Sequence, residues 1–170
     1  MKILQFLLIS FSHKILKILP YRLIRLLSFP IGTLYFLLTF RSSIKLFKRK
    51  KIFETLKINY KPLIVKINYT RYWLETLWLT NKNFSKHITP HVEIENQEYV
   101  DKLKKQYPGL IFALPHLGNW EFAIPIGNSI NLNLLAVAEP LSNSYVLNWF
   151  KTLRESLGIE IIIGGKGQNT

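Results

Sequence analysis

The sequence contains no cysteine and few acidic residues. Without a thiol the chain can form no disulfide and supply no thiolate nucleophile. Ten Asp and Glu stand against 23 Lys and Arg, which gives a formal net charge of +13. Acids are rarest at the front. Residues 1–60 hold twelve Lys or Arg but only Glu54, so eleven of the thirteen net positive charges lie there.

Charge of either sign is absent from Leu26 to Phe40. As a helix these fifteen residues would cover about 22 Å, against about 30 Å for the hydrocarbon core of a bilayer. Pro30 and Gly32 are expected to break or bend such a helix. Three placements stay open: an interfacial or re-entrant helix, a tilted single pass, or an apolar run packed on the rest of the protein.

Basic residues follow this run directly: Arg41, Lys45, Lys48, Arg49, Lys50 and Lys51. Near an anionic surface each would contribute about 1 kcal/mol, unless the cluster is only a solvated helix face. The interleaved Leu, Ile and Phe favour lipid over nucleic acid. Residues 3–19 predict an uncleaved amphipathic helix, since Pro20 and Arg22 follow instead of a cleavage site. We therefore expect 1–51 to be a membrane-associated helical region, with the chain after 41 on the cytoplasmic side.

The remainder, 52–170, predicts an α/β domain. Residues 52–84 read as helical, with dense aromatics that suit either a core or an interfacial belt. Expected strands are 92–95, 110–114, 133–138 and 159–163, and expected helices are 96–106, 122–130 and 142–157. Their alternation predicts a mostly parallel sheet flanked by helices. His87 and His91 read as surface residues, because Pro90 interrupts any helix that would pair them on a metal.

The stretch from Leu110 to Ala123 carries the candidate chemistry. An apolar run delivers His116 into a turn at Gly118, Asn119 is a good N-cap, and Glu121 falls in the first turn of a helix. A neutral imidazole can take the proton of a hydroxyl while a carboxylate fixes its tautomer, and free N–H groups at the helix start can hold an oxyanion or a phosphate. The plain alternative is a loop histidine bonded to neighbouring backbone.

His116-Leu-Gly-Asn-Trp-Glu121 resembles the His-x4-acid motif of the glycerolipid-type acyltransferases. More narrowly, it is similar to the bacterial branch with the lipid A late acyltransferases and the phosphatidylinositol mannoside acyltransferases. The resemblance runs from about Leu19 to Lys166. It includes Leu19-Pro20, Pro30-Ile31-Gly32, Pro108-Gly109-Leu110, Ala138-Glu139-Pro140 and Leu153-Arg-Glu-Ser-Leu-Gly158.

This resemblance implies a glycerolipid acyltransferase-like fold and a fatty acyl transfer from an acyl carrier protein or coenzyme A thioester to a hydroxyl of a membrane glycolipid, at the cytoplasmic face of the inner membrane. His116 would be the general base and Glu121 its partner, with Gly118, Asn119 and Arg154 as substrate-binding residues and with no metal or cofactor. Arg154 has an alternative, pairing with Glu155, Glu160 or solvent.

One rival interpretation stays open. Members of the resembled family continue beyond Gly164-Gly165-Lys166-Gly167, so we expect this chain to be a fragment or a naturally shortened relative. If it is shortened, the basic amphipathic front end would make it a non-catalytic membrane-binding module. A nucleic-acid binder ranks third.

Overall fold

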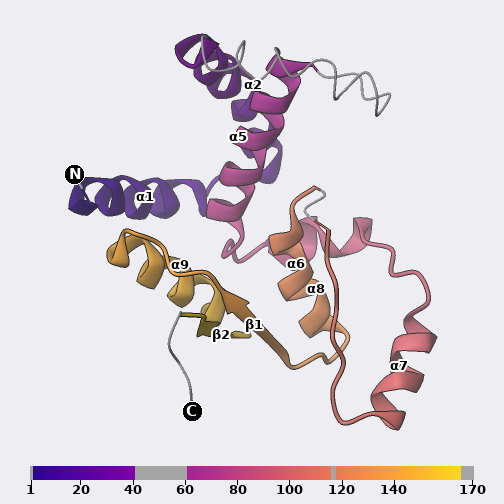
Figure 1. The fold of residues 1–170 in the computed structure, drawn as a ribbon. Coiled ribbons are helices and arrows are strands. Elements are labelled where there is room, and N and C mark those ends of the chain that lie inside the picture. The colour runs from indigo at the N-terminus through magenta and orange to yellow at the C-terminus, as the bar shows by residue number, and fades with distance from the viewer. Residues whose placement is uncertain (1, 41–60, 116–117, 166–170) are drawn as a thin grey trace, which may run out of the picture.

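The computed structural model describes residues 2–40, 61–115 and 118–165 (Figure 1). The basic cluster predicted at 41–51 lies outside these residues, and so does His116. In chain order the elements are α1 (Lys2–Leu16), α2 (Tyr21–Leu38), α5 (Pro62–Trp78), α6 (Phe84–His87), η1 (Thr89–His91), α7 (Gln97–Gln106), η2 (Trp120–Phe122), α8 (Ala123–Ser129), β1 (Leu134–Ala138), α9 (Ser144–Ser156) and β2 (Ile159–Ile163), where η marks a 3-10 turn.

Helices α2 and α5 lie side by side as a hairpin that stands apart from the sheet (Figure 1). Small residues allow the close approach, because Ser28 and Gly32 of α2 are buried and Gly32 faces the backbone of Ile67. The sequence predicts a break or a bend at Pro30 and Gly32, and the break is wrong, since α2 continues through both residues. Packing along α5 holds this turn of helix together although Pro30 supplies no backbone N–H.

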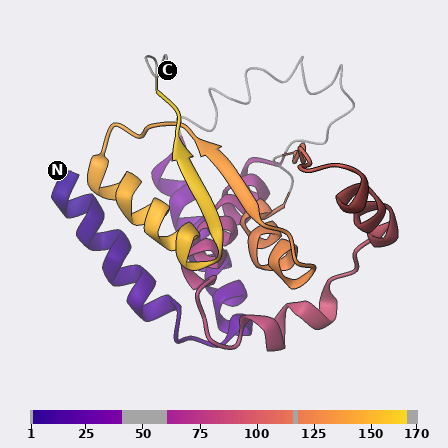
Figure 2. The ribbon, with the colours of Figure 1, turned by 90° about the horizontal axis from the view of Figure 1, so that it is seen from below.

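Helix α1 confirms that the predicted N-terminal segment is helical, and it packs along α9, as Figure 2 shows. Asn143, the N-cap of α9, donates from its side-chain amide to the carbonyl of Lys2 and to Oε1 of Gln5, both at 3.0 Å. The front of the chain is therefore tied to the start of the last helix.

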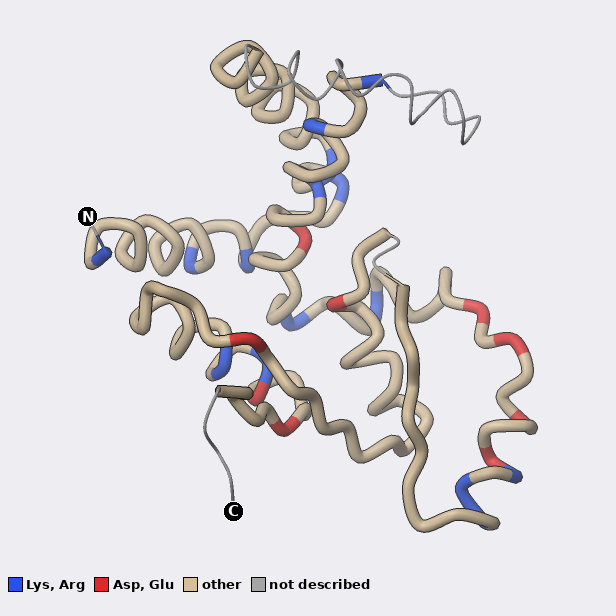
Figure 3. Tube along the Cα trace, in the orientation of Figure 1, with Lys and Arg blue, Asp and Glu red and all other residues tan. Residues whose placement is uncertain are grey.

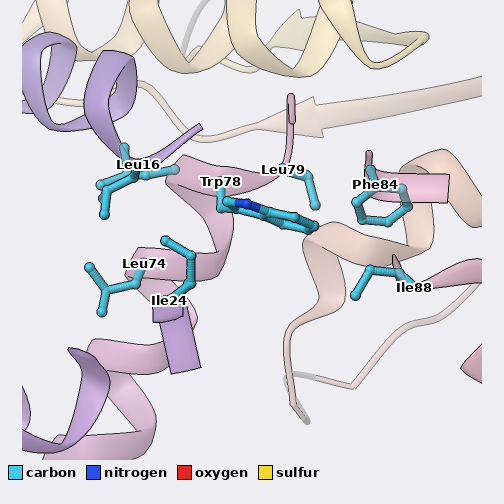
Figure 4. Packing of buried hydrophobic residues seen from close by; sticks show 8 residues of the cluster. Leu16, Ile24, Leu74, Trp78, Leu79, Phe84 and Ile88 are labelled. Carbon is cyan, nitrogen blue, oxygen red and sulfur yellow. The ribbon is translucent and has the colours of Figure 1, made fainter. Parts of the chain in front are cut away.

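The main hydrophobic core lies where α1, α2, α5 and α6 meet (Figure 4). Trp78 at its centre is fully buried, and its indole nitrogen donates to the carbonyl of Leu19 at 2.8 Å. The other buried members are Leu16, Ile24, Leu74, Leu77, Leu79, Phe84 and Ile88. Most of the dense aromatics in the predicted helical region thus belong to packed parts of the fold, whereas Tyr69 is about half exposed.

The sheet consists of β1 and β2, which pair in parallel from Leu134 with Ile159 to Ala138 with Ile163. Helix α9 forms the crossover connection between the two strands. Gly158, with a φ of +91°, lies just after the end of that helix and before β2. Buried Ile124, Ile159 and Ile161 join α8 to one face of the sheet. The predicted α/β fold with a parallel sheet flanked by helices is confirmed.

Two predicted strands are wrong. Residues 110–114 run without a strand partner among the described residues, and Ile111, Phe112 and Leu114 are exposed. Residues 92–95 pass into a turn before Asn96, whose φ is +57°. Each run has strand-like composition, but a strand needs a neighbour to accept its backbone hydrogen bonds.

The surface of the N-terminal helices is apolar and basic. Within α1, α2 and α5 Glu75 is the one acid, as Figure 3 shows along the hairpin. Large apolar side chains are exposed at Leu4, Leu8, Phe11, Leu26, Leu34, Leu37 and Leu38, among others. Of the helices that the structure describes, α2 alone has the length and composition to cross a membrane, which is weak evidence for a helix this near the N-terminus.

Candidate active site

The motif turn has the geometry that the sequence predicts. Gly118 has a φ of +61°, a conformation that side chains with a Cβ rarely adopt. The side-chain oxygen of Asn119 accepts a hydrogen bond from the backbone N–H of Glu121 at 3.2 Å, as an N-cap does. Trp120 to Phe122 then form a single 3-10 turn that leads into α8. Glu121 therefore lies in the first turn, as expected.

Glu121 is almost completely buried, with 1% of its surface exposed. Two nitrogens of Arg154 donate to its carboxylate, Nη2 to Oε1 at 2.6 Å and Nε to Oε2 at 3.1 Å. Tyr72 adds a third hydrogen bond from its hydroxyl to Oε1 at 3.3 Å. This bidentate ion pair compensates the negative charge of Glu121, whose burial would otherwise be strongly unfavourable.

Aromatic rings enclose the Arg154 guanidinium. Its central carbon lies 5.0 Å from the ring centroid of Trp120 and 5.4 Å from that of Phe150, so the rings cover a cation that is already paired. The predicted pairing of Arg154 with Glu155, Glu160 or solvent is wrong, because α9 turns this side chain toward the buried acid. Glu155 instead pairs with Lys151 at 3.6 Å on the exposed face.

Tyr72 belongs to the site, although the sequence indicates only an aromatic in a core or an interfacial belt. Burial, followed by the adjacent Glu121 carboxylate, raises the pKa of its phenol to about 12. The hydroxyl therefore keeps its proton and remains a hydrogen-bond donor to Glu121 throughout the physiological pH range. Its position on α5 connects the hairpin to the motif.

A second buried carboxylate, Glu75, was not identified from the sequence and lies beside the motif. It is 6% exposed and accepts hydrogen bonds from two different elements. The hydroxyl of Tyr21 donates to Oε1 at 3.0 Å, and the side-chain amide of Asn119 donates to Oε2 at 3.3 Å. A signal was available in the sequence, because Glu75 is an isolated acid in a basic and apolar stretch.

The structure also places the predicted substrate-binding residues of the motif turn and the two histidines before it. Gly118 is exposed at the turn, and the Asn119 side chain forms hydrogen bonds with Tyr72, Glu75 and Glu121. Substrate binding by Gly118, Asn119 and Arg154 stays a prediction. His87 and His91 are exposed, and the described residues contain no group of three possible metal ligands.

Comparison with known proteins links this arrangement to one family. The family described as bacterial lipid A biosynthesis acyltransferase matches residues 2–167. Neither a curated protein nor a solved structure matches the chain. The matched range includes the N-terminal helices, the motif turn and the strand–helix–strand unit that carries Arg154.

Proposed function

The chain belongs to the bacterial lipid A biosynthesis acyltransferase family, and from that premise we propose that it moves a fatty acyl group from an acyl thioester to a hydroxyl of a glycolipid acceptor. The donor is an acyl carrier protein or coenzyme A thioester, and the acceptor is lipid A or a related glycolipid. The observation that carries this proposal is the buried Glu121, fixed five residues after His116.

The hydrogen bonds of Glu121 are compatible with a further partner. An ionised carboxylate has about four acceptor positions, and Arg154 and Tyr72 use three of them. The remaining position is on Oε2, which accepts only the Nε–H of Arg154 among the described residues. In the proposed dyad, this is the acceptor position available to a ring N–H of His116.

In the proposed step, His116 takes the proton of the acceptor hydroxyl as its oxygen attacks the thioester carbonyl carbon. Glu121 fixes the tautomer and stabilises the imidazolium. Collapse of the tetrahedral intermediate breaks the carbon–sulfur bond, and the departing thiolate takes the proton from the imidazolium. An ester and a free thiol result. No covalent enzyme intermediate is required, which suits a sequence without cysteine.

The proposed location is the cytoplasmic face of the inner membrane. Exposed leucines and a phenylalanine on α1 and α2 support it, because water-soluble surfaces rarely collect so many large apolar side chains. Lys14, Arg22 and Arg25 lie on the same two helices, Lys17 follows α1 directly, and these cations complement anionic lipid headgroups. We place the hairpin in the interface, where a lipid hydroxyl can reach the motif laterally.

The test uses His116→Ala and Glu121→Gln in protein reconstituted into vesicles. Lauroyl-acyl carrier protein and lauroyl-coenzyme A serve in turn as donors to a lipid A precursor, and mass spectrometry detects the ester. Both variants should lose acyl transfer by at least about 100-fold while they bind vesicles like the parent. Parental rates in folded His116→Ala protein would refute the role of His116.

The exposed apolar surface of α1 and α2 also favours a second candidate, the non-catalytic membrane-binding module. In that case vesicle binding would fall with salt and with charge removal in 41–51, while His116→Ala would change nothing measurable. Acyl transfer that depends on His116 decides between the two candidates. Retention of nucleic acid by residues 1–60 without lipid would instead favour the third interpretation.

A further inference from the structure

Glu75 stands out by its position in the chain. It is the sole acid of α1, α2 and α5, which together hold six Lys or Arg, yet it is only 6% exposed. Burying a carboxylate is unfavourable unless hydrogen bonds or a cation compensate it. Among the described residues no Lys, Arg or His nitrogen lies within salt-bridge distance of Glu75. Its environment therefore depends on neutral donors.

Those donors come from two different parts of the fold, the start of α2 and the motif turn. Tyr21 begins α2 and donates its hydroxyl at 3.0 Å, while Asn119 lies in the motif and donates its amide at 3.3 Å. One carboxylate thus joins the first residue of the hairpin to the residue that caps the motif turn. Oε1 of Glu75 accepts from Tyr21, and Oε2 accepts from Asn119.

These contacts fix the orientation of the Asn119 amide. The amide nitrogen donates to Glu75 and, at 3.4 Å, to the backbone carbonyl of Tyr72, so both of its acceptors lie on α5. The amide oxygen is left facing the backbone N–H of Glu121, which it accepts at 3.2 Å. An acceptor at position 75 therefore determines which end of the amide caps the turn.

We infer that Glu75 is a positioning residue for the motif: through Asn119 it holds the single turn of η2, and with it the Glu121 carboxylate, in the geometry used for acyl transfer. This inference rests on the proposed function. Among the described residues, the Glu75 carboxylate accepts from Tyr21 and Asn119 and does not contact Glu121 directly. Because Tyr21 shares the same carboxylate, the hairpin at the membrane and the motif form one connected unit.

The experiment is a double-mutant cycle with Glu75→Gln, Asn119→Asp and both together. Glu75→Gln keeps the shape but replaces one acceptor by a donor, so kcat should fall about 10- to 100-fold with KM for the thioester changed less than about twofold. Asn119→Asp places a second carboxylate against that of Glu75, so kcat should fall further than in Glu75→Gln. In the double variant the new amide donates to the new carboxylate, which still caps Glu121, so kcat should recover at least about tenfold over Asn119→Asp.

Hydrogen exchange at the backbone amide of Glu121 supplies a readout that needs no activity. It should accelerate in each single variant and slow again in the double variant. Glu98→Gln, an exposed acid on α7, is the matched control and should leave kcat and exchange unchanged. Any variant that fails to fold drops out of the cycle, and the isosteric Glu75→Gln then decides alone.

Parental kcat and parental exchange in Glu75→Gln would overturn the inference, and so would additive losses in the double variant. A uniform loss of folded protein with normal kcat per folded molecule would also overturn it, because that pattern indicates a purely structural carboxylate. If the parent protein shows no more acyl transfer than His116→Ala, the proposed function has failed. The exchange cycle then judges the positioning role by itself.

Discussion

Helices α2 and α9 differ in how much of their apolar side-chain surface is buried. In α9, Phe150 and Leu153 are buried while Ser144, Asn148, Thr152 and Glu155 face outward, the usual pattern of a helix on a protein core. In α2, Ile24 is fully buried, but Leu26, Leu34, Leu37 and Leu38 are more than half exposed. The protein therefore buries the apolar face of α9, whereas much of the apolar surface of α2 is left uncovered by the described residues.

Charge shows the same contrast. Helix α9 turns Arg154 inward onto a buried acid, whereas α2 keeps Arg22 and Arg25 exposed. An arginine that is buried and paired has a local task in the fold or the site, while exposed arginines beside exposed leucines suit an anionic surface. Under the proposed function, the buried pair belongs to the active site and the exposed arginines belong to the membrane-binding surface.

Removing Arg154 should have the largest effect. In Arg154→Ala the Glu121 carboxylate stays buried without its cation, which should cost about 3–5 kcal/mol of unfolding free energy and abolish acyl transfer. Lys151→Ala on the same helix breaks an exposed pair with Glu155 and should stay within about 0.5 kcal/mol. Denaturant unfolding of detergent-solubilised protein measures both.

The double variant Arg154→Ala with Glu121→Gln separates stability from chemistry. Since it removes both charges, it should regain part of the lost unfolding free energy while acyl transfer stays absent. Equal stability losses for Arg154→Ala and Lys151→Ala would contradict the importance of the buried pair.

Two positions on α2 test the contrast within one helix. Ile24→Ala creates a cavity in the main core and should lower the free energy of unfolding by about 2–5 kcal/mol. Leu26 is 63% exposed, so Leu26→Ala should change the free energy of unfolding by about 0.5 kcal/mol or less. Vesicle sedimentation should rank them in reverse. Losing a leucine that is buried in lipid should weaken membrane binding roughly tenfold, since transfer of such a side chain contributes about 1.5–3 kcal/mol. Unchanged vesicle affinity in Leu26→Ala would argue against this face as the attachment surface.

The tight crossing of α2 and α5 provides a smaller test. A Cβ added at Gly32 would lie 2.6 Å from the Cα of Ile67, so Gly32→Ala must push the two helices apart. Overpacking of this kind costs about 1–3 kcal/mol, which should outweigh the roughly 1 kcal/mol that alanine gains in helix propensity. Gly109→Ala meets no atom within 4 Å and is the control. A net gain in stability for Gly32→Ala would mean that the hairpin is loosely packed.

Local signals predicted much of this structure. Gly118 and Asn119 specify the motif turn through conformations and capping that depend only on neighbouring residues, and Gly158 ends α9 in the same way. The strand at 159–163 follows from its own composition. What failed depends on distant partners. Residues 110–114 have strand-like composition without a paired neighbour, and the link between Arg154 and Glu121 spans 33 positions that no spacing rule connects. Glu75 is harder still, because its importance comes from two donors on separate elements.

Alkaline pH provides the mildest test, through Tyr72 on α5. Its pKa is raised to about 12, against 10 in the unfolded chain, so the folded state favours the neutral phenol. The stability that this group contributes is complete below pH 10 and is lost as pH rises from 10 toward 12. Tyr72→Phe should cost about 1 kcal/mol at pH 8, through the lost hydrogen bond to Glu121, and should decline less steeply above pH 10. Tyr99→Phe, an exposed position on α7, should follow the parent curve. Parallel declines of the parent and Tyr72→Phe above pH 10 would mean that folding does not raise the pKa of this phenol.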